Sequence, residues 1–186
     1  MRTFFGLFVF AAGVFAGQLL QYDDGTATWF SNEGKYRGVA FDVGHFNPDA
    51  SGFDLSFVEY WFYNSGIPPW DTDQFYAEVW DGGTAGPVSL LATQALTALH
   101  YSPCYLELAN PVTTGTGFWC IVNTELSANG SPSLLGDDGP DHNRSFYSNN
   151  MATWTAWTLG DYMVRADGEY FFHLGTGSWA SIKALF

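Results

Sequence analysis

Residues 53–63 read FDLSFVEYWFY, a run of aromatic and branched residues of the kind that fits the pleated surface of a β-sheet. In an extended strand, one face of this run carries Phe53, Leu55, Phe57 and Trp61, and the other face carries Val58, Tyr60 and Phe62. Both faces are therefore apolar. We expect one face to pack in the core and the other to be covered or to bind a partner.

The rest of the chain has the same character. Aromatic residues make up 19% of the 186 residues, Lys and Arg together number only 6, and no long stretch shows helical spacing of apolar residues. Strand-length stretches recur at Gln18–Tyr22, Tyr36–Val43, Asp54–Tyr63, Gln74–Trp80, Val88–Thr97, Cys104–Leu108, Phe118–Asn123, Arg144–Ser148, Thr153–Thr158 and Tyr162–Ala166. Turn sequences such as Asp23-Asp24-Gly25 and Asp81-Gly82-Gly83 separate them. This pattern predicts an all-β fold, a two-sheet antiparallel sandwich.

The N-terminus has the pattern of a secretory signal peptide. A basic residue, Arg2, precedes an apolar run from Phe4 to Ala16 that ends in small residues. The run is shorter than the roughly 20 residues that a membrane-spanning helix needs. We therefore expect residues 1–16 to be a leader, with no membrane span, and the protein to be secreted or held at the cell surface.

Two further segments follow from this division. Residues 17–166 are predicted to form the sandwich, and residues 167–186 an apolar C-terminal extension. An extension this apolar must be buried on its own domain or on a neighbour. Its predicted assembly contacts are Trp179, Ile182, Leu185 and Phe186.

The formal net charge of −13 restricts the partners. A strongly acidic surface repels phosphate backbones and anionic lipids, so nucleic acid is not an expected partner. Such a surface favours solubility and attracts cations, including calcium.

Cys104 and Cys120 are expected to form a disulfide, because an exported chain with one cysteine pair usually bridges it. The segment between them contains 109–116, which is rich in Thr and Gly and predicts a loop. Folding a hairpin about Val112 would place the two cysteines opposite each other on adjacent strands.

Three short motifs resemble a recurring module of bacterial secreted and surface proteins. They are YDDGTA from Tyr22, YAEVWDGG from Tyr76 and GDYMVRA from Gly160, and the stretch NRSFY from Asn143 is also similar. The resemblance covers roughly Gln18–Ala166. It implies a jelly-roll-like sandwich that is normally appended to larger proteins, and it implies no catalytic residues.

The most plausible catalytic hypothesis uses Glu59 and Glu78. The run around Glu59 resembles the strand of small jelly-roll glycosidases that carries a catalytic glutamate between aromatics, and retaining enzymes need two carboxyl groups about 5–5.5 Å apart. The second glutamate motif of those enzymes is not recognisable here. The alternative interpretation is that both glutamates are outward-facing strand residues, and the prediction is that the protein is not an enzyme.

The stretch Ser127–Asn143 is polar and predicts a long loop. Within it lie alternating oxygen-bearing side chains of the kind that bind calcium, namely Asp137, Asp138, Asp141 and Asn143. The EF-hand glycine and its closing glutamate are missing, so the alternative is a solvated turn. Calcium is the only cofactor that the sequence suggests.

These observations favour a non-enzymatic extracellular structural protein. We expect a self-assembling subunit of a fibre or surface layer, formed when a terminal segment completes a neighbour's sheet. The main alternative is a carbohydrate-binding or adhesive module that uses exposed Trp and Tyr to hold a glycan. A glycoside hydrolase that uses Glu59 and Glu78 is the third class.

Overall fold

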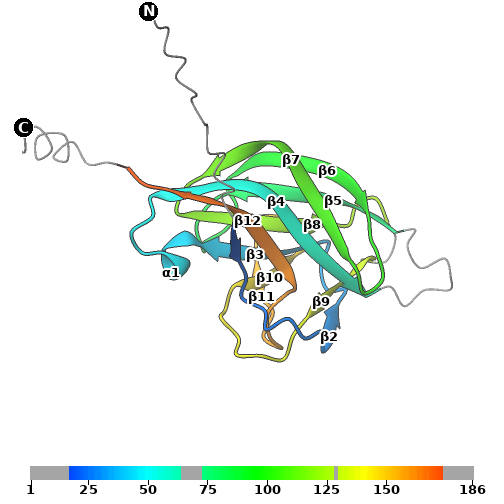
Figure 1. Ribbon diagram of the computed structural model, residues 1–186. Helices are drawn as coiled ribbons and strands as arrows, with labels where there is room; N and C mark the ends of the chain where they lie inside the picture. Colours follow the sequence, from blue (N-terminus) through cyan, green and yellow to red (C-terminus); the bar gives the residue numbers. More distant parts are fainter. Residues whose placement is uncertain (1–16, 64–72, 128–129, 174–186) are drawn as a thin grey trace, which may run out of the picture.

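A computed structural model describes residues 17–63, 73–127 and 130–173 of the chain. These residues form an all-β fold of two antiparallel sheets, with strands arranged in two layers (Figure 1). Among them, no helix has the length and the apolar character needed to cross a membrane. The predicted fold class, an antiparallel two-sheet sandwich, is confirmed.

The first sheet is built around β4. In order, its strands are β1 (Gln18–Leu20), β12 (Val164–Phe171), β4 (Gly52–Tyr63), β9 (Ser133–Gly136) and β2 (Trp29–Ser31), and β7 (Pro103–Thr114) also pairs with β4. The long strand β4 therefore lies between β12 and β7 over most of its length and meets β9 only at its end.

The second sheet covers the first. In order, its strands are β11 (Thr155–Ala156), β10 (Ser145–Ser148), β3 (Tyr36–Asp42), β8 (Gly117–Asn123), β5 (Gln74–Asp81) and β6 (Ser89–Thr97). One short helix, α1 (Val43–Phe46), follows β3 directly. At the far edge of this sheet, β6 pairs with β5.

A β-bulge in β4 changes which residues share a face, so the predicted assignment of residues to its two faces is wrong in part. Between Leu55 and Phe57, β4 advances two residues while its partner β12 advances one, from Gly168 to Asp167, so Ser56 is an extra residue in the alternation. Phe53 and Leu55 therefore face the core together with Val58, Tyr60 and Phe62, all fully buried. Phe57 and Trp61 lie on the outer face, which is less apolar than strict alternation predicts.

The core between the sheets is dominated by aromatic rings. Phe118 of β8 stacks on Phe41 with ring centroids 5.1 Å apart and on Phe53 of the opposite sheet at 6.1 Å. Burial of one such ring contributes roughly 1.5–3 kcal/mol. The contact between Phe53 and Phe118 joins the two layers directly.

A buried arginine also links the layers at one end. The guanidinium group of Arg37, on β3, donates hydrogen bonds to the carbonyl oxygens of Ser31 and Gly130. Burial lowers the pKa of Arg37 to about 10, so the side chain still carries its charge at neutral pH. Because neither partner is a carboxylate, the desolvated charge is compensated only by carbonyl dipoles.

The outer face of the second sheet is covered by the chain itself. Trp119 of β8 points outward yet is fully buried, because Trp154 and Phe146 pack over it at centroid distances of 4.8 and 5.1 Å. Its indole N–H donates to the carbonyl oxygen of Gly83. This apolar face is therefore covered without a second molecule.

Most predicted strands exist, and the differences lie at their ends and in the loops. The predicted loop 109–116 is wrong, because β7 continues to Thr114 and pairs with β4 again at Val112–Thr114, after a register shift that leaves 108–111 without a partner on β4. The predicted extension 167–186 begins too early, since β12 runs on to Phe171. Two short strands were not predicted, β2 and β9, and β9 lies inside the stretch expected to be a loop.

The predicted disulfide between Cys104 and Cys120 is also wrong. Cys104 lies on β7 and Cys120 on β8, which belong to opposite sheets, and both face the core. No bridge joins them. A disulfide needs Cα atoms within about 7 Å of each other and Cβ atoms directed at one another, and the Cys104 side chain is directed at the turn that precedes β7. The Cys104 thiol instead donates to the carbonyl oxygen of Thr97, which tethers the turn between β6 and β7.

The variant Trp154→Ala tests whether Trp154 covers the outer face of the second sheet. Removing this indole should uncover Trp119, reduce the free energy of unfolding by about 2–3 kcal/mol and make Trp119 emission accessible to acrylamide. The control is Trp29→Ala, which removes an indole that is already 44% exposed and should cost far less stability. Equal losses from the two variants would contradict the proposed cover.

Candidate functional site

A buried carboxylate ties three loops together at one end of the sandwich. The side chain of Asp137 is 1% exposed. Its Oδ2 accepts the backbone N–H of Asp24 and its Oδ1 accepts that of Asp161, both at 2.7 Å. We call this set the carboxylate clamp. It joins the turn after β1, the loop after β9 and the segment that enters β12.

Gly160 allows the clamp to form. Its φ of +143° is one that side-chain-bearing residues rarely adopt, and a Cβ at this position would lie 2.2 Å from the carbonyl oxygen of Asp137. The glycine of the GDYMVRA motif is therefore required by close backbone approach.

Asp161 extends the clamp into a polar cluster. Its fully buried carboxylate accepts the backbone N–H of His142 and contacts the Nδ1 of the same residue at 2.6 Å. The Ser145 hydroxyl donates to it and also accepts the backbone N–H of Tyr162. Burial raises the pKa of Asp161, while the neighbouring His142 acts in the opposite direction.

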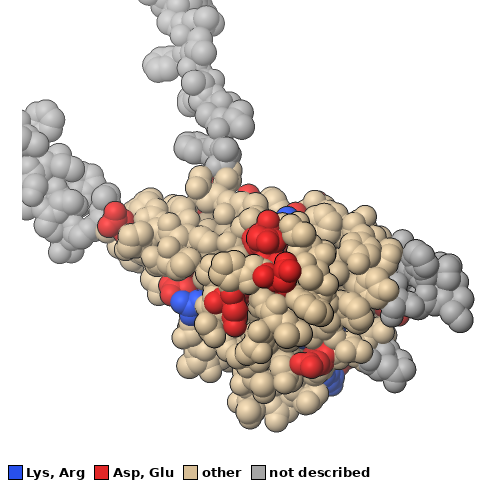
Figure 2. Space-filling model, turned by 90° about the horizontal axis from the view of Figure 1, so that it is seen from below, with Lys and Arg blue, Asp and Glu red and all other residues tan. Residues whose placement is uncertain are grey.

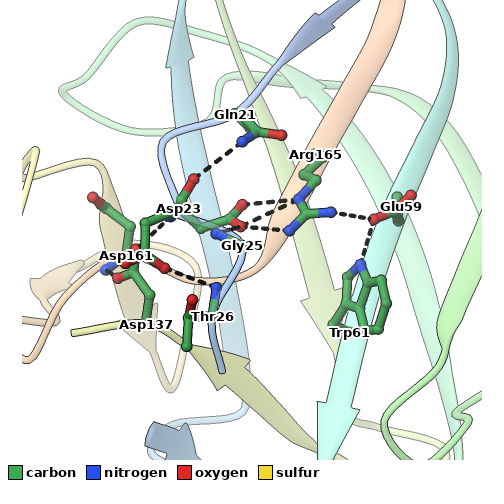
Figure 3. Close-up of polar contacts among 10 residues, drawn as sticks. Gln21, Asp23, Gly25, Thr26, Glu59, Trp61, Asp137, Asp161 and Arg165 are labelled. Carbon is green, nitrogen blue, oxygen red and sulfur yellow. Dashed lines mark hydrogen bonds and ion pairs between the residues drawn. The ribbon is translucent and has the colours of Figure 1, made fainter. Parts of the chain in front are cut away.

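Arg165 connects this cluster to the outer face of the first sheet, as Figure 3 shows. Its Nε and Nη2 donate to the carboxylate of Asp23, the shortest contact being 2.6 Å, and its Nη1 donates to Glu59 at 3.0 Å. The indole N–H of Trp61 donates to the same Glu59 oxygen, and the guanidinium lies 5.6 Å from the Trp61 ring centroid. One arginine thus fixes two carboxylates and one indole.

The outer face of the first sheet carries a group of partly exposed rings that we call the aromatic face. Its members are Phe30, Phe57, Trp61, Tyr63, Tyr101 and Tyr105. Phe57 meets Tyr105 edge to face at 6.0 Å, and Tyr63 contacts both Phe30 at 4.7 Å and Tyr101 at 5.7 Å. The exposed fractions of Phe30, Tyr101 and Tyr105 are 52%, 51% and 44%. Unlike the outer face of the second sheet, these rings remain open to solvent.

A shallow hollow of about 310 Å³ lies at one end of the aromatic face, lined by Ser56, Phe57, Tyr105 and Glu107. The desolvated Tyr105 hydroxyl lies beside Glu59, and both effects raise the pKa of Tyr105.

The predicted calcium ligands are not gathered into one site. Asp137 is engaged in the clamp, Asp138 accepts the Thr28 hydroxyl at 3.0 Å, and Asp141 accepts the backbone N–H of Asn143 at 2.6 Å. Within the described part of the chain, no group of three or more His, Cys, Asp or Glu side chains is placed to hold a metal ion. In the structure Asp141 stabilises a local turn, whereas Asp137 and Asp138 bond to the segment that follows β1.

The two glutamates of the catalytic hypothesis lie on opposite faces of the sandwich. Glu59 alternates with Val58 and Tyr60 of the core and so points outward from the first sheet. Glu78, on β5, points outward from the second sheet, where it accepts hydrogen bonds from Asn123 at 2.8 Å and the Trp80 indole at 2.7 Å. Two packed sheets separate the carboxylates, so they cannot act as a pair across one glycosidic bond.

The edge strand β6 is the second surface of interest. Its nine residues, SLLATQALT, contain neither a charged residue nor a proline. Within the described ranges it pairs with β5 alone, so its other edge is a sheet boundary. Leu90 is 46% exposed, and Ala95 is exposed as well. Natural sheets usually protect such an edge with charges, proline or a bulge. β6 has one irregularity, at Leu91, where its register with β5 shifts between Val79 and Trp80, and the stretch from Ala92 to Thr97 pairs regularly.

Several site residues were not predicted from the sequence. Arg165 and Tyr105 belong to stretches that had been recognised as strands, but nothing local shows that both lie beside Glu59. Their registers, Glu59 opposite Arg165 and Glu59 opposite Tyr105, depend on long-range pairing. The predicted assembly contacts Trp179, Ile182, Leu185 and Phe186 lie outside the described residues.

Comparison with known proteins gives no assignment. No protein-family model matches the chain, and no curated protein matches it.

The clamp predicts different effects for two neighbouring aspartates. Asp137→Asn would set an amide N–H₂ against a backbone N–H and lower the free energy of unfolding by about 1–3 kcal/mol. Asp138→Asn removes the same charge at an exposed position and should change stability by less than about 0.5 kcal/mol. Chemical denaturation of both variants measures the difference, and equal stabilities would argue against the clamp.

A second prediction concerns pH. Burial raises the pKa of Asp161 above its ordinary value of 3.8. Between pH 3.8 and the raised pKa, Asp161 is therefore still protonated in the folded state, whereas in the unfolded chain it has lost its proton. Stability from this residue is therefore present below pH 3.8 and is lost as the pH rises through the window. The stability difference between wild type and Asp161→Asn, measured by urea denaturation, should decrease from about pH 3.5 to pH 7. A difference that grows with pH would contradict this assignment.

Proposed function

We propose that the protein is a non-catalytic, secreted structural subunit that self-assembles by strand addition at β6. In this proposal the sandwich is jelly-roll-like and belongs to the bacterial surface-protein module that its motifs resemble. Residues 1–16 act as the export signal. Glu59 and Glu78 have no catalytic role in it, because they face opposite sides of the molecule.

The observation that carries the proposal is the uncharged edge of β6. An edge strand presents backbone N–H and C=O groups that a partner strand can pair with. Over nine residues, β6 has no side chain that would prevent such pairing. The turn from β6 into β7 is held by the hydrogen bond from the Cys104 thiol to Thr97. This turn lies at one end of β6, so it leaves the rest of the edge accessible to a partner strand.

Net charge explains why assembly would use this edge. Two molecules of charge −13 repel each other at most of their surface, and Figure 2 shows acidic side chains spread over one side of the molecule with few basic ones. Close approach costs least where neither molecule carries a charge. The sequence of β6 meets this condition, and salt that screens the remaining repulsion should promote assembly.

The proposed occupant of the edge is segment 174–186 of a second copy. This segment is longer than β6, contains Lys183 as its single charged side chain, and includes the predicted contacts Trp179, Ile182, Leu185 and Phe186. An edge that receives a different segment of the next molecule makes a head-to-tail contact. Such contacts do not close on themselves in general, so they produce filaments.

The test compares matched alanine-to-lysine variants of the secreted protein. Wild type should form large species in sedimentation velocity and filaments in negative-stain images at physiological salt. Ala95→Lys places a charge on the exposed side of β6 and should remain monomeric. Ala152→Lys, at an exposed loop position, should assemble like wild type.

A second variant tests the occupant. Ile182→Glu combined with Leu185→Glu should also abolish assembly, because two charges would have to lie against the second sheet. A wild-type protein that is monomeric at high concentration, or an Ala95→Lys variant that assembles normally, would overturn the proposal.

A further inference from the structure

The aromatic face has no role in the proposed assembly, since β6 belongs to the other sheet. Two groups of rings lie on it, Phe57 with Tyr105 and Tyr63 with Phe30 and Tyr101. Between them stand Glu59, Arg165 and Trp61, which are bonded to one another (Figure 3). We propose that this face binds a chain of neutral sugar residues.

The rings supply the stacking surface that a sugar needs. A pyranose ring presents C–H groups on its faces, and these are attracted to the electron-rich face of an aromatic ring. Tyr105 is 44% exposed and Tyr101 is 51% exposed, so both retain surface that a ligand can cover. Because the two groups lie on the same sheet face, a polymer can contact both at once.

The polar groups between the rings suit hydroxyls. Glu59 accepts from Arg165 and Trp61 through Oε1, and the carboxylate lone pairs that these two bonds do not use can accept sugar O–H groups. The Tyr105 phenol can donate or accept a hydrogen bond, and Glu107 lines the hollow beside it. Apolar surface that alternates with hydrogen-bonding groups suits a polyhydroxylated ligand, whereas a lipid or an apolar peptide would remove these polar groups from water without offering them new hydrogen bonds.

The negative charge of the aromatic face favours neutral sugars over anionic ones. Glu59, Glu107 and Asp167 lie on or beside this face, and Arg165 is already paired with Asp23 and Glu59. An anionic glycan would therefore meet carboxylates, and the described residues of this face include no unpaired cation to neutralise it.

The face is also pre-organised. The ion pair between Arg165 and Glu59 and the indole bond of Trp61 hold its centre, and the rings stand on paired strands or contact one another. Little side-chain entropy is lost when a ligand binds to groups that are already fixed.

A larger hollow of about 790 Å³ is the rival location. It lies at the other sheet, is lined by Tyr76 and by polar residues including Asn32 and Asn149, and its Lys35 and Glu125 pair with each other. It offers one aromatic ring where the aromatic face offers several, so it provides less surface for a sugar chain.

The experiment is affinity electrophoresis of the full-length secreted protein in gels containing neutral polysaccharides (mannan, xylan and mixed-linkage glucan), with alginate and heparin as anionic comparisons. We expect retardation by at least one neutral polymer and by neither anionic one. Tyr105→Ala and Tyr101→Ala should each weaken binding about five- to tenfold. Tyr76→Ala, a matched variant on the opposite face, should bind as wild type, and circular dichroism checks that each variant is folded.

Other outcomes would overturn the inference. These are retardation by no neutral polymer, equal retardation by heparin, or loss of binding in Tyr76→Ala alone. Self-association that Tyr105→Ala abolishes and Ala95→Lys does not would assign the face to a protein partner instead. Ala95→Lys leaves the aromatic face unchanged, so this variant should lose assembly and keep sugar binding. The two proposals can therefore fail independently of each other.

Discussion

The carboxylate of Asp137 fixes the geometry on which the open side of this protein depends. Its two oxygens accept two backbone N–H groups, and loss of the bond to the buried N–H of Asp161 would cost about 1–3 kcal/mol. Through Asp161 it sets where the chain enters β12, and through the turn at Asp24 it sets the position of Asp23. Arg165 can bridge Asp23 and Glu59 only when both the start of β12 and the turn at Asp24 are held in these positions.

The two outer faces of the sandwich differ in a way that bears on function. On the second sheet, Trp154 and Phe146 cover Trp119, so this apolar surface needs no partner. On the first sheet, an ion pair and partly exposed rings share the surface. The chain therefore covers one apolar face with its own residues and leaves the other available, while the edge of β6 is a third, uncharged surface.

The sequence predicted the fold class because alternation and turn residues are local signals. Asp23-Asp24-Gly25 is a turn, as its spacing predicts, with Gly25 at a φ of +87° and its N–H bonded to Asp23. Long-range pairing was not predictable in the same way. The bulge between Leu55 and Phe57 moved residues between faces, and β7 joined β4 instead of folding back on β8, which separated the cysteines. The site could not be predicted for the same reason. Glu59 lies beside Arg165 and Tyr105 only because of the strand registers, and no local sequence pattern encodes these registers.

The central claim is that the edge of β6 pairs with a strand from a neighbouring molecule. Backbone amide hydrogen exchange, followed as a function of protein concentration, tests it most directly because it reports on the hydrogen bonds themselves. We predict that those amides of Ser89–Thr97 that point away from β5 gain protection on assembly, while those of the central strand β8 stay unchanged. Exchange in β6 that is identical in dilute and concentrated protein would contradict the account.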